Sequence, residues 1–453
     1  MKRQLVATLL VLIALPAFAA SAPGAGIAAL LTHADAGLGL ARPELVRRMA
    51  HRSRARRRRL LSSQATEADR PVRAGLGAGA GGSIVTNEYL VHLSVGTPPR
   101  PVALTLDTGS DLVWTQCAPC LDCFDQGLAL LDPALSSTYA ALPCDAPLCR
   151  ALPFTSCGGG GGGAGGSWGE RSCVYVYHYG DKSLTVGQLA ADRFTFGNGD
   201  GHSERRLTFG CGHFNKGIFQ ANETGIAGFG RGRWSVPSQL GVTSFSYCFT
   251  SMFESKSSLV TLGAAAELRS GTVFQSTPLI KDPSQPSLYF LSLKGISVGS
   301  KRLPVPERRL RSTIIDSGAS ITTLPEEVYE AVKAEFMAQV GLPVIGAEAG
   351  AALDLCFALP ATAPFWRGRG RKRAVAVPSL TLHLDGADWE LPRGNYVFED
   401  HGARVMCLVL DAAAGEQTVI GNYQQQNTHV VYDLDRDVLS FAPARCDQLV
   451  ASL

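Results

Sequence analysis

The sequence has no apolar run long enough to cross a membrane. Its longest such run, residues 5–15, is shorter than the roughly 20 residues that a spanning helix needs. This run follows Lys2 and Arg3, and it precedes Ala17-Phe18-Ala19, a small-x-small cleavage pattern. The C-terminal end carries neither an endoplasmic-reticulum retention tetrapeptide nor a hydrophobic anchor tail. We therefore expect a signal peptide over residues 1–20 and a secreted, extracellular chain with no stable membrane anchor.

The sequence also offers little for nucleophilic or metal chemistry. No Gly-x-Ser-x-Gly elbow stands between a strand-like and a helix-like run, and the even count of 12 Cys leaves no obvious free thiol nucleophile. The CAPCLDC stretch at 117–123 could hold a metal, but no His-rich partner sits nearby, and export to an oxidising compartment favours disulfides. We predict up to six disulfides, no metal and no cofactor.

Lysine is absent from the segment at 21–83, which is nevertheless strongly basic. It holds 11 Arg and 4 acidic residues, a net charge of +7, and it ends in the flexible composition GLGAGAGGS. Residues 84–453 have 29 Lys and Arg against 35 Asp and Glu. Such a basic run is usually solvated or binds nucleic acid, but nucleic acid is a poor partner for a secreted chain. We interpret 21–83 as a removable pro-segment that neutralises an acidic cleft.

Helical periodicity is scarce: only residues 326–340, which follow Pro325, have clear helical spacing. Short runs rich in Val, Tyr, Phe, Thr and Leu, bounded by turn residues, indicate strands instead. These runs are YLVHLSVG (89–96), VALTLD (102–107), CVYVYHYG (173–180), RLTFGCG (206–212), SLVTLG (258–263), YFLSLKGISVG (289–299), TIID (313–316), SLTLHL (379–384), HVVYDL (429–434) and VLSFAP (438–443). The pattern predicts a mainly β protein.

A weak internal repeat divides the body of the chain. Asp107-Thr108-Gly109-Ser110 is followed by Ile226-Ala227-Gly228, and Asp316-Ser317-Gly318-Ala319 is followed by Val419-Ile420-Gly421. Each half thus offers an Asp-hydroxyl-Gly turn and, later, an apolar-apolar-Gly strand end. Such duplication predicts two similar lobes. We place them at 84–280 and 281–453.

The two Asp turns carry the functional prediction. One such turn alone could be an Asp that caps a turn, but two turns related by twofold symmetry would bring Asp107 and Asp316 together in a cleft. Two adjacent carboxylates share a proton, so that one can deprotonate a water while the other donates to a carbonyl oxygen. The supporting residues would be Gly109 and Gly318, through their N–H groups, the cross-linking hydroxyls of Thr108 and Ser317, and Ser110, which would donate to the outer oxygen of Asp107.

These motifs resemble the pepsin-like aspartic proteases, and more narrowly their nepenthesin-like plant branch. The resemblance covers 84–453. The stretch YGDKSLTVG (179–187) is similar to the substrate-covering flap, with Tyr179 and Gly180 at its tip and Trp114 as the support of that tyrosine. The motifs GIAGFGRG (225–232) and VIGNYQQQNTHVVYDLDRDVLSFAP (419–443), together with a Cys-rich insert before the flap, complete the match.

The resemblance implies a bilobal pepsin-like acid protease fold, with two pseudo-twofold-related β lobes and the active-site cleft between them. It implies an aspartic endopeptidase that is made as a zymogen, acts on protein or peptide substrates and is a monomer of the apoplast or cell wall. It also implies the disulfides Cys117–Cys120, Cys123–Cys211, Cys144–Cys173, Cys149–Cys157, Cys248–Cys446 and Cys356–Cys407.

Three surface features complete the expectations. Asn222-Glu223-Thr224 is the one glycosylation sequon and fits an exposed loop. The Gly run at 158–166 should be mobile. The basic run WRGRGRKR (366–373) should be an exposed loop that could serve as a processing site or docking patch.

One residue departs from the family pattern. Pepsin-like enzymes usually carry Thr or Ser where this chain has Ala319, so Asp316 lacks the hydroxyl that Ser110 offers Asp107. Losing a donor to the ionised form should raise the apparent pKa values of the pair and displace activity toward higher pH. Relatives of this fold that act as inhibitors of cell-wall-degrading enzymes offer an alternative, a protease-like binding protein. This chain keeps Asp107, Asp316, Tyr179 and Trp114, which favours the enzyme.

Overall fold

The structure is a computed structural model. It describes residues 26–53, 89–158, 172–197, 202–219, 222–263, 273–345, 353–360, 375–413 and 415–449. The predicted signal peptide, leader residues 21–25 and 54–83, nearly all of the Gly run and the basic run 366–373 lie outside the described residues. Within the described residues, no helix combines the length and apolarity that crossing a bilayer would require.

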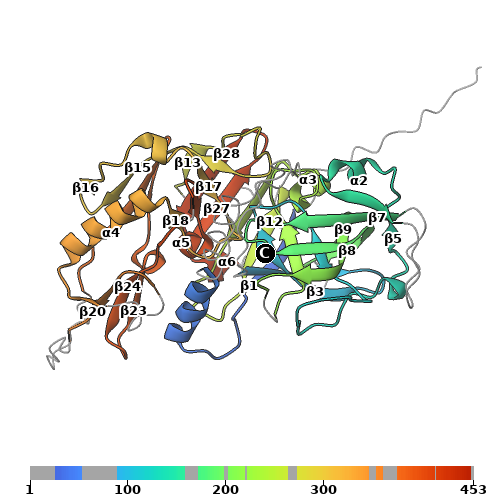
Figure 1. The fold of residues 1–453 in the computed structure, drawn as a ribbon, viewed down its shortest axis with the longest axis horizontal. Coiled ribbons are helices and arrows are strands. Elements are labelled where there is room, and N and C mark those ends of the chain that lie inside the picture. Colours follow the sequence, from blue (N-terminus) through green and yellow to red (C-terminus); the bar gives the residue numbers. More distant parts are fainter. Residues whose placement is uncertain are drawn as a thin grey trace, which may run out of the picture.

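The largest sheet runs through both lobes (Figure 1). In the order in which its strands pair, it contains β13 (Gln275–Pro278), β28 (Val438–Pro443), β27 (Thr428–Asp433), β11 (Ser244–Cys248), β12 (Ser258–Leu262), β1 (Ile27–His33), β2 (Tyr89–Val95), β3 (Arg100–Asp107), β10 (Gly225–Gly228), β4 (Trp114–Gln116), β9 (Ser203–Lys216), β8 (Leu184–Phe196), β7 (Ser172–His178) and β6 (Thr155–Gly158), with β5 (Ala140–Ala141) on β8.

Three smaller sheets build the second lobe. They are β14 (Phe290–Leu291), β17 (Thr313–Ile315), β26 (Thr418–Ile420), β18 (Thr323–Leu324) and β25 (Asp411–Ala412); β16 (Lys301–Arg302), β15 (Leu293–Val298), β21 (Leu380–Leu384) and β22 (Ala387–Glu390); and β19 (Val344–Ile345), β20 (Cys356–Ala358), β24 (Val405–Leu408) and β23 (Val397–Asp400). The mainly β, bilobal prediction is confirmed, and all ten strand-like runs form strands.

Helices are few and short. They are α2 (Pro147–Ala151), α3 (Val236–Leu240), α4 (Glu326–Val340), α5 (Asn422–Gln425) and α6 (Cys446–Leu449), the helical residues 42–53, and the 3-10 turns η1 (Pro133–Leu135), η4 (Glu307–Arg309) and η5 (Arg393–Asn395). The predicted helix 326–340 is confirmed as α4. It buries Val328, Val332 and Phe336 on one face and ends at Gly341, whose positive φ of 64° suits glycine.

The duplicated motif forms the same local structure in each half. Strand β3 runs parallel to β10, which places Asp107 opposite Gly228. Strand β17 runs parallel to β26, which places Ile315, the residue before Asp316, opposite Ile420. Each Asp turn therefore leaves a strand beside an apolar-apolar-Gly strand, and the internal repeat is structural.

Part of the leader is built into the body, which the sequence did not predict. Strand β1 lies between β2 and β12 in the main sheet. The helical residues 42–53 bury Leu45, Val46 and Met49 in an apolar cluster with residues of the second lobe; this blue helix lies at the lower middle of Figure 1. The leader's Asp35 is buried between Arg48 and Arg52, at 3.3 and 3.2 Å.

Candidate active site

The two Asp turns meet between the lobes. Asp107 ends β3 and Asp316 directly follows β17, and both side chains are fully buried. Gly318 lies between them: a Cβ built there would stand 2.3 Å from Asp107 Oδ1 and 3.2 Å from Asp316 Oδ1. Only a residue without a side chain allows the two carboxylates to approach the same backbone atom.

A reciprocal pair of hydrogen bonds cross-links the turns. The backbone N–H of Thr108 donates to Ser317 Oγ at 2.9 Å, and the N–H of Ser317 donates to Thr108 Oγ1 at 2.9 Å. The Ser317 hydroxyl donates in turn to the carbonyl of Leu106 at 2.8 Å. Because each turn is held by the hydroxyl of the other, the relative position of the two carboxylates depends on both lobes.

Each carboxylate also accepts a bond from its own turn. The N–H of Gly109 donates to Asp107 Oδ1 at 2.9 Å, and the N–H of Gly318 donates to Asp316 Oδ1 at 2.8 Å. The hydroxyl of Ser110 donates to the other oxygen of Asp107. At the matching position, Ala319 is buried in an apolar cluster with Leu288, Phe290, Ile314 and Val419. The two turns thus share the Gly donor, and Ala319 stands where the first turn has the hydroxyl of Ser110.

The predicted flap is the hairpin that joins β7 and β8. At its turn, Tyr179 is 4% exposed, and its hydroxyl accepts a hydrogen bond from Trp114 Nε1 at 2.6 Å. Burial, and then the electrostatic influence of Tyr177 and Asp107, raises the pKa of Tyr179 well above its usual range. The phenol therefore stays neutral, and because it accepts from Trp114 its own proton remains available for donation.

Comparison with known proteins agrees with this geometry. Two family models, xylanase inhibitor N-terminal and xylanase inhibitor C-terminal, match residues 89–264 and 288–443. The chain is 37% identical to aspartic proteinase nepenthesin-1 of Nepenthes gracilis over 93% of this chain and 90% of that protein. It is 36% identical to aspartyl protease family protein 2 of Arabidopsis thaliana, over 84% and 76%.

The chain belongs to the nepenthesin-like plant branch of the pepsin-like aspartic proteases. Among solved structures, basic 7S globulin from soybean is similar with a TM-score of 0.62 at 20% identity, over 80% of this chain and 95% of that one. The crystal structure of edgp gives a TM-score of 0.60 at 21% identity, over 80% of this chain and 92% of that one. These likenesses show that the chain shares its fold with both structures.

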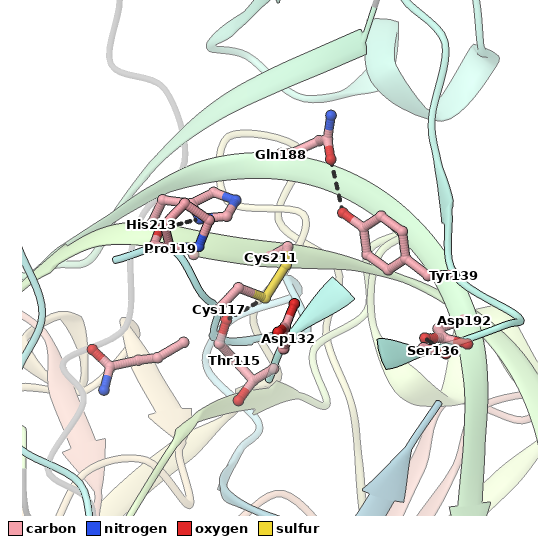
Figure 2. The surroundings of a disulfide bond; sticks show 12 residues. Thr115, Cys117, Pro119, Asp132, Ser136, Tyr139, Gln188, Asp192, Cys211 and His213 are labelled. Atoms are coloured by element: carbon pink, nitrogen blue, oxygen red, sulfur yellow. Dashed lines mark hydrogen bonds between the residues drawn. A yellow bond between two sulfur atoms is a disulfide. The ribbon is translucent and has the colours of Figure 1, made fainter. Parts of the chain in front are cut away.

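All twelve Cys form disulfides, but four of the expected pairings are wrong. The structure joins Cys117 to Cys211 and Cys120 to Cys123 (Figure 2 shows the former). Strand β4 runs parallel to β9 with Thr115 opposite Cys211, which brings the Cα atoms of Cys117 and Cys211 to 5.3 Å. With all three Cys of CAPCLDC in disulfides, no thiolate of this stretch remains for a metal.

The second correction lies in the insert before the flap. Cys149 pairs with Cys173 and Cys144 pairs with Cys157. Cys149 and Cys173 are buried in one apolar cluster, whereas Cys144 and Cys157 lie nearer the surface. The two buried Cys pair with each other, and so do the two near the surface. Because the sequence does not reveal how deeply each Cys lies, it could not predict this pairing. The expected bridges Cys248–Cys446 and Cys356–Cys407 are confirmed.

Asn222 of the glycosylation sequon is exposed, and its side-chain N–H donates to the carbonyl of Ala34 in the leader at 2.6 Å.

The sequence analysis overlooked one residue close to the site, Asp111. It is 8% exposed, and its carboxylate accepts from Gly232 N–H at 2.8 Å and from the Ser287 hydroxyl. Its position four residues after Asp107 was the available signal.

Proposed function

We propose that this protein is a secreted aspartic endopeptidase, made as a zymogen, in which Asp107 and Asp316 activate a water for peptide-bond hydrolysis. The observation that carries the proposal is the meeting of both carboxylates at Gly318, held by the reciprocal Thr108–Ser317 hydrogen bonds. Membership of the nepenthesin-like family, whose named relatives include aspartic proteinases, supports it.

The proposed mechanism needs one proton shared by the pair. The ionised carboxylate takes a proton from a water, and the water oxygen attacks the carbonyl carbon of the scissile peptide. The protonated carboxyl donates to the carbonyl oxygen as the tetrahedral intermediate forms. Collapse of that intermediate breaks the C–N bond, and the leaving nitrogen takes up a proton. The Gly109, Gly318 and Ser110 donors hold the carboxylates in place throughout.

The flap and the leader would control access. Tyr179 sits at the turn of a hairpin next to Trp114, where closure over a bound peptide would exclude water. The leader would block the cleft in the precursor and leave at acid pH. Its described part already occupies a strand position in the main sheet, so its departure requires that β2 and β12 give up their partner.

A second candidate is a protease-like binding protein. Two observations favour it: the family models that match both halves are those of a xylanase inhibitor, and Ala319 removes one expected hydroxyl from the site. The candidate remains secondary, because the two carboxylates, their glycine donors and the Tyr179–Trp114 pair are all in place.

Proteolysis of an unfolded protein at roughly pH 3–6, where a carboxylate pair that shares a proton should work, tests the proposal. The acid-treated precursor is compared with Asp107→Ala, with pepstatin, and with Asp388→Asn, which removes a largely exposed carboxylate as a matched control. We expect a loss on the order of 10³-fold or more in Asp107→Ala and with pepstatin, and none in the control. A folded, leader-free protein that cleaves nothing would favour the binding protein.

A further inference from the structure

Asp111 is a buried carboxylate that the proposed mechanism does not use. It lies on the same turn as Asp107, and the segment 225–232, which consists of β10 and the loop that follows it, is folded tightly around it. A Cβ on Gly230 would lie 2.4 Å from Asp111 Oδ1, and a Cβ on Gly232 would lie 2.0 Å from Asp111 Oδ2. These two glycines of the GIAGFGRG motif therefore make room for one specific side chain.

The same loop holds the catalytic turn along its length. The N–H of Phe229 donates to the carbonyl of Asp107 at 2.7 Å, and the N–H of Gly230 donates to the carbonyl of Ser110 at 2.8 Å. Asp111 adds the bond to Gly232, and it accepts from Ser287, in the segment that leads into β14 of the second lobe. Asp111 thus joins the first turn, the loop that follows β10 and the segment that enters the second lobe.

The carboxylate of Asp111 forms no ion pair with a described cation. Among the described residues, no Lys, Arg or His forms an ion pair with it; its partners are an N–H and a hydroxyl. Facing it are Asp107 on its own turn, Tyr177 of β7, whose hydroxyl accepts from Asp111 N–H, and Tyr289. Arg231 is the nearby cation, but it pairs with Asp437 and lies over the Tyr289 ring.

We propose that Asp111 is a positioning residue whose negative charge, held beside Asp107 by Gly232 and Ser287, keeps the shared proton on the Asp107–Asp316 pair and so extends activity toward higher pH. The reason is Coulombic: a second negative charge beside the pair opposes loss of its last proton. This inference rests on the proposed peptidase function, and it assigns to that site a third carboxylate.

The two limbs of the pH profile should respond differently to loss of this charge. Burial, and then the charge of Asp107, raise the pKa of Asp111 to about 6 despite the bonds from Ser287 and Gly232. Around the acidic limb, Asp111 is therefore already protonated and has no charge to remove. Above that range it is ionised, and only there can it influence the pair. A purely structural role would change both limbs or only the height of the profile.

The test compares kcat/KM against pH for wild type and Asp111→Asn, with acid-treated full-length precursor and a quenched fluorogenic peptide that wild type cleaves. Asn keeps the shape and an oxygen acceptor for Gly232. We expect the alkaline limb to move down by about half a pH unit while the acidic limb stays in place. Ser287→Ala removes a hydrogen bond that stabilises the ionised form of Asp111, so it should move the alkaline limb in the same direction but by less.

Asp388→Asn is the matched control, because Asp388 is a largely exposed carboxylate that pairs with His383 and has no contact with the loop around Asp111. It should move neither limb. An alkaline limb that stays in place in Asp111→Asn, or one that moves equally in Asp388→Asn, overturns the inference.

Pepstatin binding against pH separates failure of this inference from failure of the proposed function. If binding fades at lower pH in Asp111→Asn than in wild type, the inference stands even where no substrate is cleaved, and the peptidase proposal alone fails. If binding fades at the same pH in both, the inference fails even where both proteins cleave. If wild type neither cleaves nor binds pepstatin, both fail.

Discussion

The two Asp turns share a backbone plan and differ in the residues that follow it. Both place a carboxylate at a strand end, donate a Gly N–H to it and exchange a hydroxyl bond with the other turn. After the glycine, the first turn continues with Ser110 and Asp111, and the second with Ala319 and Ser320. The first turn thus has a hydroxyl donor directly after the glycine and a second carboxylate next to it, while the second has a methyl group packed in an apolar cluster and then the buried hydroxyl of Ser320.

This difference separates two tasks within one site. The shared backbone plan fixes where the carboxylates lie, because neither turn can move without breaking a bond to the other. The residues that differ act on charge: Ser110 favours the ionised form of Asp107, and Asp111 adds a negative charge beside it. We therefore expect changes in the shared plan to reduce activity at every pH, and changes in the differing residues to move the pH profile.

Gly318→Ala should have the largest effect, because it breaks the shared plan. Its Cβ would stand 2.3 Å from Asp107 Oδ1, inside the contact distance of any carbon and oxygen, so the two carboxylates must separate. We expect kcat/KM to fall about 100-fold or more at all pH values. Gly394→Ala, where a Cβ has open space, is the control and should stay near wild type. Near-normal activity in Gly318→Ala would mean that the turns do not need this close approach.

Asp111→Asn should change the pH dependence of stability. The pKa of Asp111 is about 6 in the fold against an ordinary value of 3.8, so the fold favours the protonated form. This contribution is fully present below about pH 4 and is lost as pH rises through about 6. Between these limits, the free energy of unfolding of wild type should therefore fall by about 2–3 kcal/mol relative to that of Asp111→Asn.

Urea unfolding of both proteins at about pH 4 and pH 7 measures this double difference. Asp437→Asn, which removes a carboxylate whose pKa is shifted the other way, serves as the comparison. The pKa of Asp437, although burial acts against it, is lowered by Lys281 and Arg231, so its contribution to stability is lost only below about pH 4. Between about pH 4 and pH 7 the stability of Asp437→Asn should therefore change nearly as that of wild type does. Equal pH dependence in wild type and Asp111→Asn would show that Asp111 titrates normally.

Much of this comparison could be predicted from the sequence. The repeated Asp-hydroxyl-Gly and apolar-apolar-Gly motifs predicted both lobes and the positions of Asp107 and Asp316, because each motif encodes its own local turn. The helix α4 was also predictable, since its buried face repeats with helical spacing. Local sequence was sufficient wherever a short segment determines its own conformation.

The remaining features depend on contacts between distant segments. Strand β1 is rich in Ala and Leu, which favour helices, and only its place between β2 and β12 makes it a strand. The helical residues 42–53 could have been found from the spacing of Leu45, Val46, Met49 and Ala50. The Cys144–Cys157 and Cys149–Cys173 pairing follows from depth, and the environment of Asp111 from a loop more than a hundred residues away.

Ser110→Ala should make the first turn resemble the second. The hydroxyl of Ser110 donates to the outer oxygen of Asp107 and favours its ionised form. Without this bond the pair should hold its first proton more tightly, so the acidic limb of kcat/KM should move up by about one pH unit. The alkaline limb should respond less, because Asp111 is unchanged. Thr108→Ala is the contrast: it breaks the cross-link, so its main effect should be a lower rate at every pH.

Ala319→Thr performs the reverse change and should have the smallest effect. A hydroxyl at this position could donate to Asp316 as Ser110 does to Asp107, so the acidic limb should move down. The new side chain must, however, fit a pocket formed by Leu288, Phe290, Ile314 and Val419, which costs about 1–2 kcal/mol in packing. This strain opposes the geometry that the bond needs, so we expect the acidic limb to shift by only about half a pH unit.

Ala319→Val, which adds bulk without the hydroxyl, separates the effect of the hydrogen bond from that of packing. An acidic limb that moves down equally in both variants would assign the shift to packing, and an unmoved limb in Ala319→Thr would show that Ala319 does not set the pH range of the site.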